Sequence, residues 1–106
     1  MYDTINVNVK VELIGSADYS SGAYEFNTLQ VIRWNGELYY AEDSGCSCPI
    51  PFDGFAIGDG DASKGYVKAT KHEIAARLNE RLAEYGTDPW PHTTSEVHTL
   101  IARLMR

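Results

Sequence analysis

The sequence contains no run of about 18 or more apolar residues, the length that a membrane-spanning helix needs. Its N-terminus, M-Y-D-T-I-N-V-N-V-K, has neither the basic start nor the apolar core of a signal peptide, so we expect a cytoplasmic protein with no membrane partner. Only two residues are cysteines, which in a reducing compartment should be thiols or metal ligands. There is no internal repeat, and 106 residues suit one domain, 1–106.

Basic residues are scarce as well. Nine Lys and Arg stand against fifteen Asp and Glu, which gives a formal net charge of −6. The excess of acid lies in residues 1–63, where Lys10 and Arg33 are the only bases. Because binding to nucleic acid depends on clustered lysine and arginine, this composition disfavours a nucleic-acid partner. An acidic surface is typical of ordinary solubility, and the alternative is contact with a basic partner.

The first predicted element is a half-buried strand over about 4–14, in which apolar and polar residues alternate. The apolar members of the alternation, expected to face the core, are Ile5, Val7, Val9, Val11 and Leu13. The turn-forming residues of 15–22 predict a surface loop, with Tyr19 as its only large apolar anchor.

Asn35-Gly36 is a strong hairpin signal, because a type I′ turn needs positive φ at both central positions. The flanking runs predict strands over about 23–34 and 37–42. A two-residue turn sets Trp34 opposite Glu37 and Ile32 opposite Tyr39.

Apolar residues occur on both faces of this hairpin, so we expect the second face to be covered by the helices or by another chain. Exposed strand edges of this kind make a homo-oligomer a reasonable prediction. The phase of the apolar pattern shifts along the first strand of the hairpin. A β-bulge near Asn27-Thr28 would account for that shift.

The C-terminal part predicts two amphipathic helices, over about 71–85 and 94–105. Each begins with a capping-box pattern: Thr70 with Glu73, and Thr93 with Glu96. The predicted fold class is α+β, a three-stranded antiparallel sheet packed against two C-terminal helices. Within the first helix Arg77 and Arg81 are four residues apart among glutamates, which indicates an internally paired helix surface.

Between the strands and the helices lies a long irregular loop, 43–66. A loop of this length in a compact domain is usually kept for binding or another function, or is partly disordered. It holds both cysteines, Cys46 and Cys48, and its prolines make the chain around Ile50 stiff and extended.

The segment L-Y-Y-A-E-D-S-G-C-S-C-P-I-P-F, residues 38–52, resembles a family of small uncharacterised actinobacteriophage proteins with an S-G-C-S-C-P-x-P-F loop. The resemblance covers about one seventh of the chain. It implies a phage accessory protein in the cytoplasm of an infected bacterium, and it carries no activity with it. The residues that it highlights are Ser44, Gly45, Cys46, Cys48, Pro49, Pro51 and Phe52.

Zinc binding and thiol chemistry are alternatives that the cysteines leave open. A zinc site would combine Cys46 and Cys48 with His72 and His92, but C-x-C is tighter than the usual C-x₂₋₄-C spacing. A reactive thiol needs a depressed pKa and usually a histidine base, and no nucleophile motif is present. We therefore expect no cofactor and no enzyme activity, with a small metal- or thiol-dependent regulator as the alternative.

The function that the sequence favours is that of a non-enzymatic protein-interaction module that modulates a host cytoplasmic protein. Aromatic anchors on stiff segments bind with a small ordering cost and often dominate an interface. The alternative for the two phenylalanines is that they cap the sheet and complete a small core. The candidate binding residues are Cys46, Cys48, Ile50, Phe52, Phe55 and Trp90.

Overall fold

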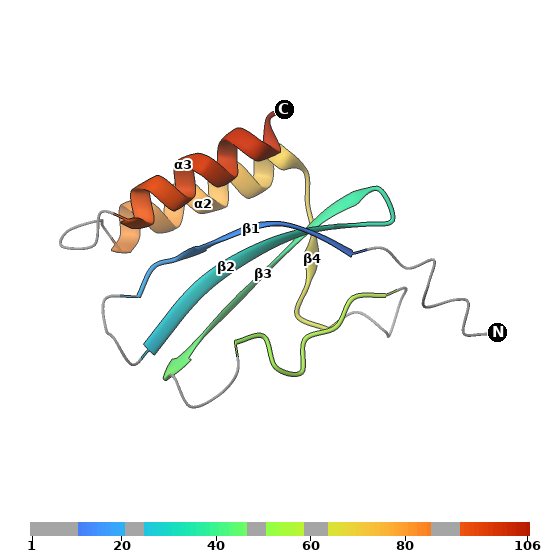
Figure 1. The fold of residues 1–106 in the computed structure, drawn as a ribbon, viewed down its shortest axis with the longest axis horizontal. Helices are drawn as coiled ribbons and strands as arrows, with labels where there is room; N and C mark the ends of the chain where they lie inside the picture. Colours follow the sequence, from blue (N-terminus) through green and yellow to red (C-terminus); the bar gives the residue numbers. More distant parts are fainter. Residues whose placement is uncertain (1–10, 21–24, 47–50, 59–63, 86–91) are drawn as a thin grey trace.

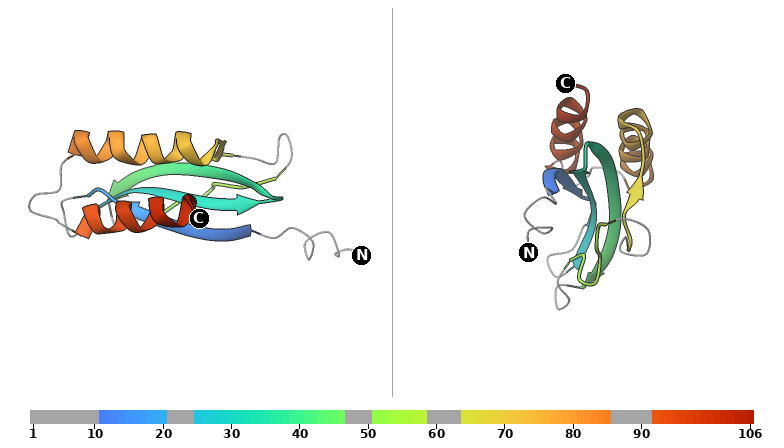
Figure 2. Two further views of the ribbon diagram at one scale, coloured as in Figure 1. Left: turned by 90° about the horizontal axis from the view of Figure 1, so that it is seen from above. Right: turned by 90° about the vertical axis from the view of Figure 1, so that its right-hand side faces the viewer.

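The computed structural model of the chain describes residues 11–20, 25–46, 51–58, 64–85 and 92–106. In these ranges the elements are β1 (Val11–Asp18), β2 (Glu25–Trp34), β3 (Glu37–Cys46), β4 (Val67–Lys68), α2 (Lys71–Tyr85) and α3 (His92–Leu104). The strands form one antiparallel sheet in the order β1-β2-β3-β4. Both helices lie side by side over one face of it (Figures 1 and 2).

The α+β class, with an antiparallel sheet and two C-terminal helices, is confirmed. The prediction of three strands is wrong, because β4 pairs with β3 through Tyr39 and Tyr40 and adds a fourth strand. This short strand directly follows the predicted loop, and two residues give too little pattern to detect. None of the described helices is long and apolar enough to span a membrane.

The β2–β3 hairpin is confirmed in its turn and register. Asn35 and Gly36 have φ values of 55° and 81°, and Trp34 pairs with Glu37 as predicted. The pairing continues without interruption to Glu25 opposite Cys46, so the bulge expected at Asn27-Thr28 is absent. Strand β3 also runs on to Cys46 instead of ending at Glu42, which shortens the loop predicted over 43–66.

The irregularity is in β1, where the register shifts between Leu13 and Gly15. Because side chains alternate along a strand, the extra residue there reverses the faces that odd-numbered residues occupy. Val11 and Leu13 pair with residues on the sheet face away from the helices and are 48% and 61% exposed. Their predicted place in the core is therefore wrong; Ile5, Val7 and Val9 lie outside the described residues.

Strand β1 continues through the segment 15–18, where a surface loop was expected. Ala17 is fully buried and Tyr19 is nearly so. Together they join the core between the sheet and the helices, whose buried members are Ile14, Ala17, Tyr19, Leu29, Val31, Ile74, Leu78, Val97, Leu100 and Leu104. The turn-forming residues of this segment thus belong to an edge strand, because the small side chain of Ala17 fits beneath α3.

The predicted capping box at the start of α2 is confirmed: the Glu73 amide donates to Thr70 Oγ1, and the Thr70 amide donates to Glu73 Oε1. The second predicted capping box, Thr93 with Glu96, is wrong. Helix α3 starts at His92, and Thr93 and Glu96 instead bind the end of β1. Thr93 Oγ1 donates to the Asp18 carbonyl at 2.8 Å, and the Asp18 amide donates to Glu96 Oε1 at 2.9 Å.

The second face of the sheet is contacted by the chain's own segment between β3 and β4, of which 51–58 and 64–66 are described. Figure 1 shows residues 51–58 on the opposite side of the strands from the helices. The Tyr66 hydroxyl donates to Gln30 Oε1 at 2.5 Å, and the Phe52 amide donates to Asp43 Oδ2 at 2.8 Å. Ala41, between these two contacts on the same face, is 1% exposed.

Candidate functional site

Two neighbouring residues of β3, Glu42 and Asp43, organise the polar contacts on the two sides of the sheet. Successive side chains of a strand point to opposite faces. Glu42 therefore faces α2, whereas Asp43 faces the segment that covers the second face. One strand position thus anchors the helical layer, and the next anchors the long connection.

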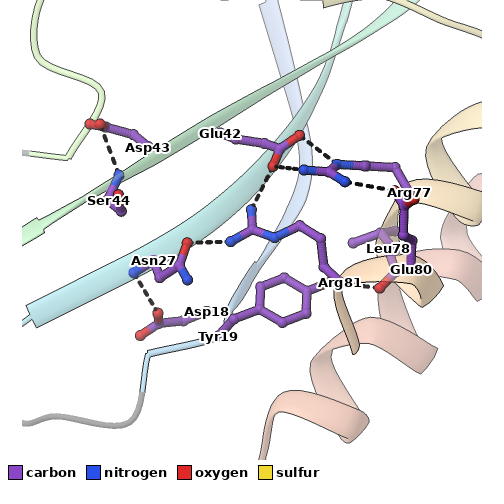
Figure 3. Close-up of polar contacts among 10 residues, drawn as sticks. All are labelled: Asp18, Tyr19, Asn27, Glu42, Asp43, Ser44, Arg77, Leu78, Glu80 and Arg81. Atoms are coloured by element: carbon purple, nitrogen blue, oxygen red, sulfur yellow. Dashed lines mark hydrogen bonds and ion pairs between the residues drawn. The ribbon is translucent and has the colours of Figure 1, made fainter. Parts of the chain in front are cut away.

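On the helix side, Glu42 accepts hydrogen bonds from two arginines of α2 (Figure 3). Arg77 binds it in bidentate fashion, with Nε to Oε2 and Nη2 to Oε1 both at 2.8 Å. Arg81 Nη1 reaches the same Oε1 at 2.9 Å. A further contact joins Arg77 to Glu80, on the same helix, at 2.6 Å. Glu42 therefore ties α2 to the sheet through charge-assisted bonds, which are the stronger kind.

Arg81 is the most buried charged residue of the described chain, at 3% exposure. Its guanidinium lies 4.5 Å from the centre of the Tyr19 ring and 5.3 Å from that of Tyr85, and Nη2 donates to Asn27 Oδ1. Its Nε has no hydrogen-bond partner. Aromatic faces and a carboxylate together compensate a cation that burial would otherwise penalise.

Burial and the contacts of this cluster shift the pKa values of Glu42, Arg77 and Tyr19. Hydrogen bonds from Arg77, with the charges of both arginines, lower the pKa of Glu42 although burial opposes the shift. The hydrogen bond to Glu42 is the main cause that raises the pKa of Arg77. Burial raises the pKa of Tyr19 to about 12 against the opposing charge of Arg81, and its hydroxyl donates to the Leu78 carbonyl at 3.0 Å. At neutral pH Glu42 is thus a carboxylate, Arg77 a cation and Tyr19 a neutral phenol.

A polar pocket of about 270 Å³ adjoins this cluster where β2 and β3 meet the end of α2. Its lining residues are Asn27, Glu42, Asp43, Ser44, Arg81 and Tyr85. Within this lining Glu42 is paired with Arg81, whereas Asp43 accepts hydrogen bonds from main-chain amides. The pocket is thus a hydrophilic recess whose one guanidinium is already paired.

On the other side of the sheet, Asp43 holds Phe52 through its main chain, and three aromatic rings follow in sequence. Phe52 and Phe55 meet edge to face with centroids 5.2 Å apart, and Phe55 meets Tyr66 in the same way at 6.0 Å. All three are half-buried. We call Phe52, Phe55 and Tyr66 the aromatic ridge.

Two backbone features shape the aromatic ridge. Phe52 has a φ of 64°, a left-handed conformation that is unusual for a bulky residue. Gly65, with φ 83°, lies so close to Phe55 that an added Cβ would be only 2.3 Å from the ring. The ridge therefore depends on one strained residue and one glycine.

With this geometry established, comparison with known proteins gives one match. A family model described as "Domain of unknown function (DUF7574)" covers residues 2–106. The chain belongs to this family. No curated protein and no solved structure matches it.

In this DUF7574 chain the predicted binding residues are only partly brought together. Phe52 and Phe55 touch each other in the aromatic ridge. The main chain of Cys46 ends β3, opposite Glu25. The remaining candidates, Cys48, Ile50 and Trp90, lie outside the described residues.

The histidines proposed as zinc ligands lie far apart. His72 is exposed in the first turn of α2, and His92 is exposed at the start of α3. Because the two helices run antiparallel, these ends lie at opposite sides of the helical layer (Figure 1). Among the described residues, no group of three or more His, Cys, Asp or Glu could hold a metal ion.

The part played by Arg81 was not predicted from the sequence. Arg77 and Arg81 were expected to form an internally paired helix surface; Arg77 does pair with Glu80 on its own helix, but both arginines also cross to Glu42 on the sheet. A signal was present, because Arg81 follows Ile74 and Leu78 at the spacing of the buried helix face. A charged residue at such a position requires a buried partner.

Proposed function

We propose that this DUF7574 chain is a non-enzymatic protein-interaction module that contacts its partner through the aromatic ridge. The observation that carries the proposal is the conformation of Phe52. Strained backbone of this kind persists where the surroundings impose it and is concentrated at functional sites. Here the Asp43 carboxylate accepts the Phe52 amide, and the Phe55 ring packs against the Phe52 ring.

The aromatic ridge has the chemistry of an interface centre. Aromatic side chains offer a large contact area with few rotatable bonds, and they are enriched among residues that dominate binding energy. The edge-to-face contacts from Phe52 to Tyr66, and the Tyr66–Gln30 hydrogen bond, fix the rings before any partner arrives. Little ordering cost then remains to be met on binding.

The resemblance of residues 38–52 to actinobacteriophage proteins suggests where a partner should be sought. We propose a phage accessory role in which the module modulates a cytoplasmic protein of the bacterial host. Cys48, Ile50 and Trp90 remain predicted contributors to the same interface.

Affinity capture from lysate of the bacterial host tests this proposal with wild-type protein and a Phe52→Gly variant. Glycine removes the ring and also relieves the left-handed backbone, so the variant should remain folded. We expect the captured partner to be lost with Phe52→Gly. Val67→Ala serves as a control, because it truncates an exposed apolar residue of β4 outside the ridge.

A second variant, Phe52→Ala, separates recognition from stability. Alanine removes the ring but keeps the strain, so we expect it to unfold more readily than Phe52→Gly, by about 1 kcal/mol. Equal capture by wild type and a folded Phe52→Gly variant would contradict the proposal. The ridge would then be only a cap on the sheet.

A further inference from the structure

Among the described residues, side chains of α3 bind the main chain in one half of the outer edge of β1, and no strand pairs with the other half. Helix α3 covers the half after the bulge: Arg103 Nη1 donates to the Ile14 carbonyl at 2.9 Å, and Thr93 and Glu96 bind the main chain of Asp18. At Val11–Leu13 no described strand pairs with β1 on its outer side. An open strand edge is a template for an added strand.

Beside this open edge lies a hollow of about 460 Å³ in which positive charge predominates. Its lining residues are Glu12, Leu13, Ile14, Arg33, Arg103 and Arg106. Glu12 accepts one hydrogen bond from Arg33, at 3.1 Å, and both side chains remain exposed to solvent. Arg106 makes no ion pair with any described residue. Three arginines against one glutamate are an exception in a chain whose net charge is −6.

The two faces of the open edge differ in chemistry. Glu12 and Arg33 pair across the strands on the helix side, whereas Val11 and Leu13 project on the other side and are exposed. A strand added at this edge would place alternate side chains on each face. Acidic side chains would then meet the arginines, and apolar ones would extend the surface of Val11 and Leu13.

From these observations we propose that the β1 edge at Val11–Leu13, with the arginine hollow, binds an extended segment of a partner protein in which acidic and apolar residues alternate. Strand addition supplies main-chain hydrogen bonds, and the alternating pockets supply specificity. A second copy fits this edge less well, because antiparallel pairing of two β1 strands would bring two arginine clusters together. This site is separate from the aromatic ridge, so either can fail alone.

A peptide titration followed by NMR of the labelled full chain tests the inference. The probe is acetyl-Glu-Val-Glu-Val-Glu-Val-amide, compared with its lysine counterpart acetyl-Lys-Val-Lys-Val-Lys-Val-amide. We expect the acidic peptide to shift the amides of Val11–Leu13 and the guanidinium signals of Arg33 and Arg106. Its affinity should exceed that of the lysine peptide at least tenfold and should fall as salt is raised.

Two charge-reversal variants test whether the preference for the acidic peptide comes from the arginine hollow or from the net charge of the protein. Arg106→Glu should weaken binding of the acidic peptide at least fivefold, because it reverses a charge in the hollow. Lys64→Glu changes the net charge by the same amount, but at an exposed residue of the segment between β3 and β4, which does not line the hollow. This variant should leave binding nearly unchanged. Equal weakening by both variants would show general repulsion and would overturn the site.

An N-methylated acidic peptide tests strand addition itself. Methylation of alternate amides on the pairing side should abolish binding, whereas undiminished binding would exclude main-chain pairing.

Light scattering over a range of protein concentrations tests whether a second copy of the chain occupies this edge instead. A dimer that Leu13→Asp dissociates would assign this edge to a second copy and overturn the proposal of an acidic segment.

Discussion

At the scale of single residues, the fold places three side chains where their chemistry has consequences beyond packing. Arg81 is buried between Tyr19 and Glu42 and joins helix to sheet. The Asp43 carboxylate accepts the main-chain amide of Phe52, which has a left-handed backbone. Arg81 thus joins segments that are distant in sequence, and Asp43 and Phe52 join β3 to the segment that covers the second face.

Tyr19 gives a test of the buried cluster at alkaline pH. Burial raises its folded pKa to about 12 from 10.0. The folded state thus holds the phenolic proton more tightly, so this stabilisation is complete below pH 10 and is lost as the pH rises towards 12. We expect wild type to lose stability more steeply across this window than Tyr19→Phe, measured by urea unfolding.

The same variant has a second expected effect. At neutral pH, Tyr19→Phe should be less stable than wild type by about 1 kcal/mol, because the Leu78 carbonyl loses its donor. Parallel alkaline curves for the two proteins would show that Tyr19 titrates normally, contrary to this account.

At the scale of elements, the sequence predicted those with strong local signals. The Asn35-Gly36 turn and the cap at Thr70 depend on adjacent residues, and both appear as expected. The bulge in β1 could not be placed, because the register depends on which residues α3 and β2 bury. Thr93 matched a capping pattern, but the Asp18 carbonyl competes for its hydroxyl.

The candidate site was less predictable than the fold. The loop composition pointed to Phe52 and Phe55, which do meet. Their arrangement, however, depends on Asp43 and Tyr66, which lie on either side of the loop, and on the side chain of Gln30 in another strand. Such contacts arise only once the sheet brings these segments together.

A pair of glycine substitutions tests how the aromatic ridge is assembled. Gly54 and Gly65 both have positive φ, and a Cβ at Gly54 would meet nothing within 4 Å. Both alanine variants therefore incur the backbone penalty of about 1–2 kcal/mol. Only Gly65→Ala should also displace the Phe55 ring. We expect it to be the less stable variant and to shift the ring signals of Tyr66 in NMR spectra.

Equal destabilisation by the two glycine variants would mean that the Phe55 ring moves aside without cost. The aromatic ridge would then lack the rigidity on which its proposed function depends.

At the scale of the whole molecule, one sheet is contacted on its two faces by different parts of the same chain. Helices α2 and α3 lie over one face, and the segment before β4 lies against the other (Figure 2). A second chain was one of the ways in which that face was expected to be covered. The chain's own connection provides part of the cover, and the contact proposed at the β1 edge would lie apart from it.

The aromatic ridge and the β1 edge would give the molecule two contact surfaces of different chemistry, one aromatic and one basic with apolar flanks. A partner that used both would gain from their linkage, because the second contact would form at a high effective concentration. The proposed function nevertheless depends on the ridge alone.

The most direct test of that function is a titration of the captured host partner against wild type and Phe52→Gly. Residues that dominate an interface cost about 2 kcal/mol or more when truncated, so the variant should bind at least tenfold more weakly. Its free energy of unfolding should remain within about 1 kcal/mol of wild type, since relief of strain offsets the lost ring contacts. Equal dissociation constants for the two folded proteins would contradict the account.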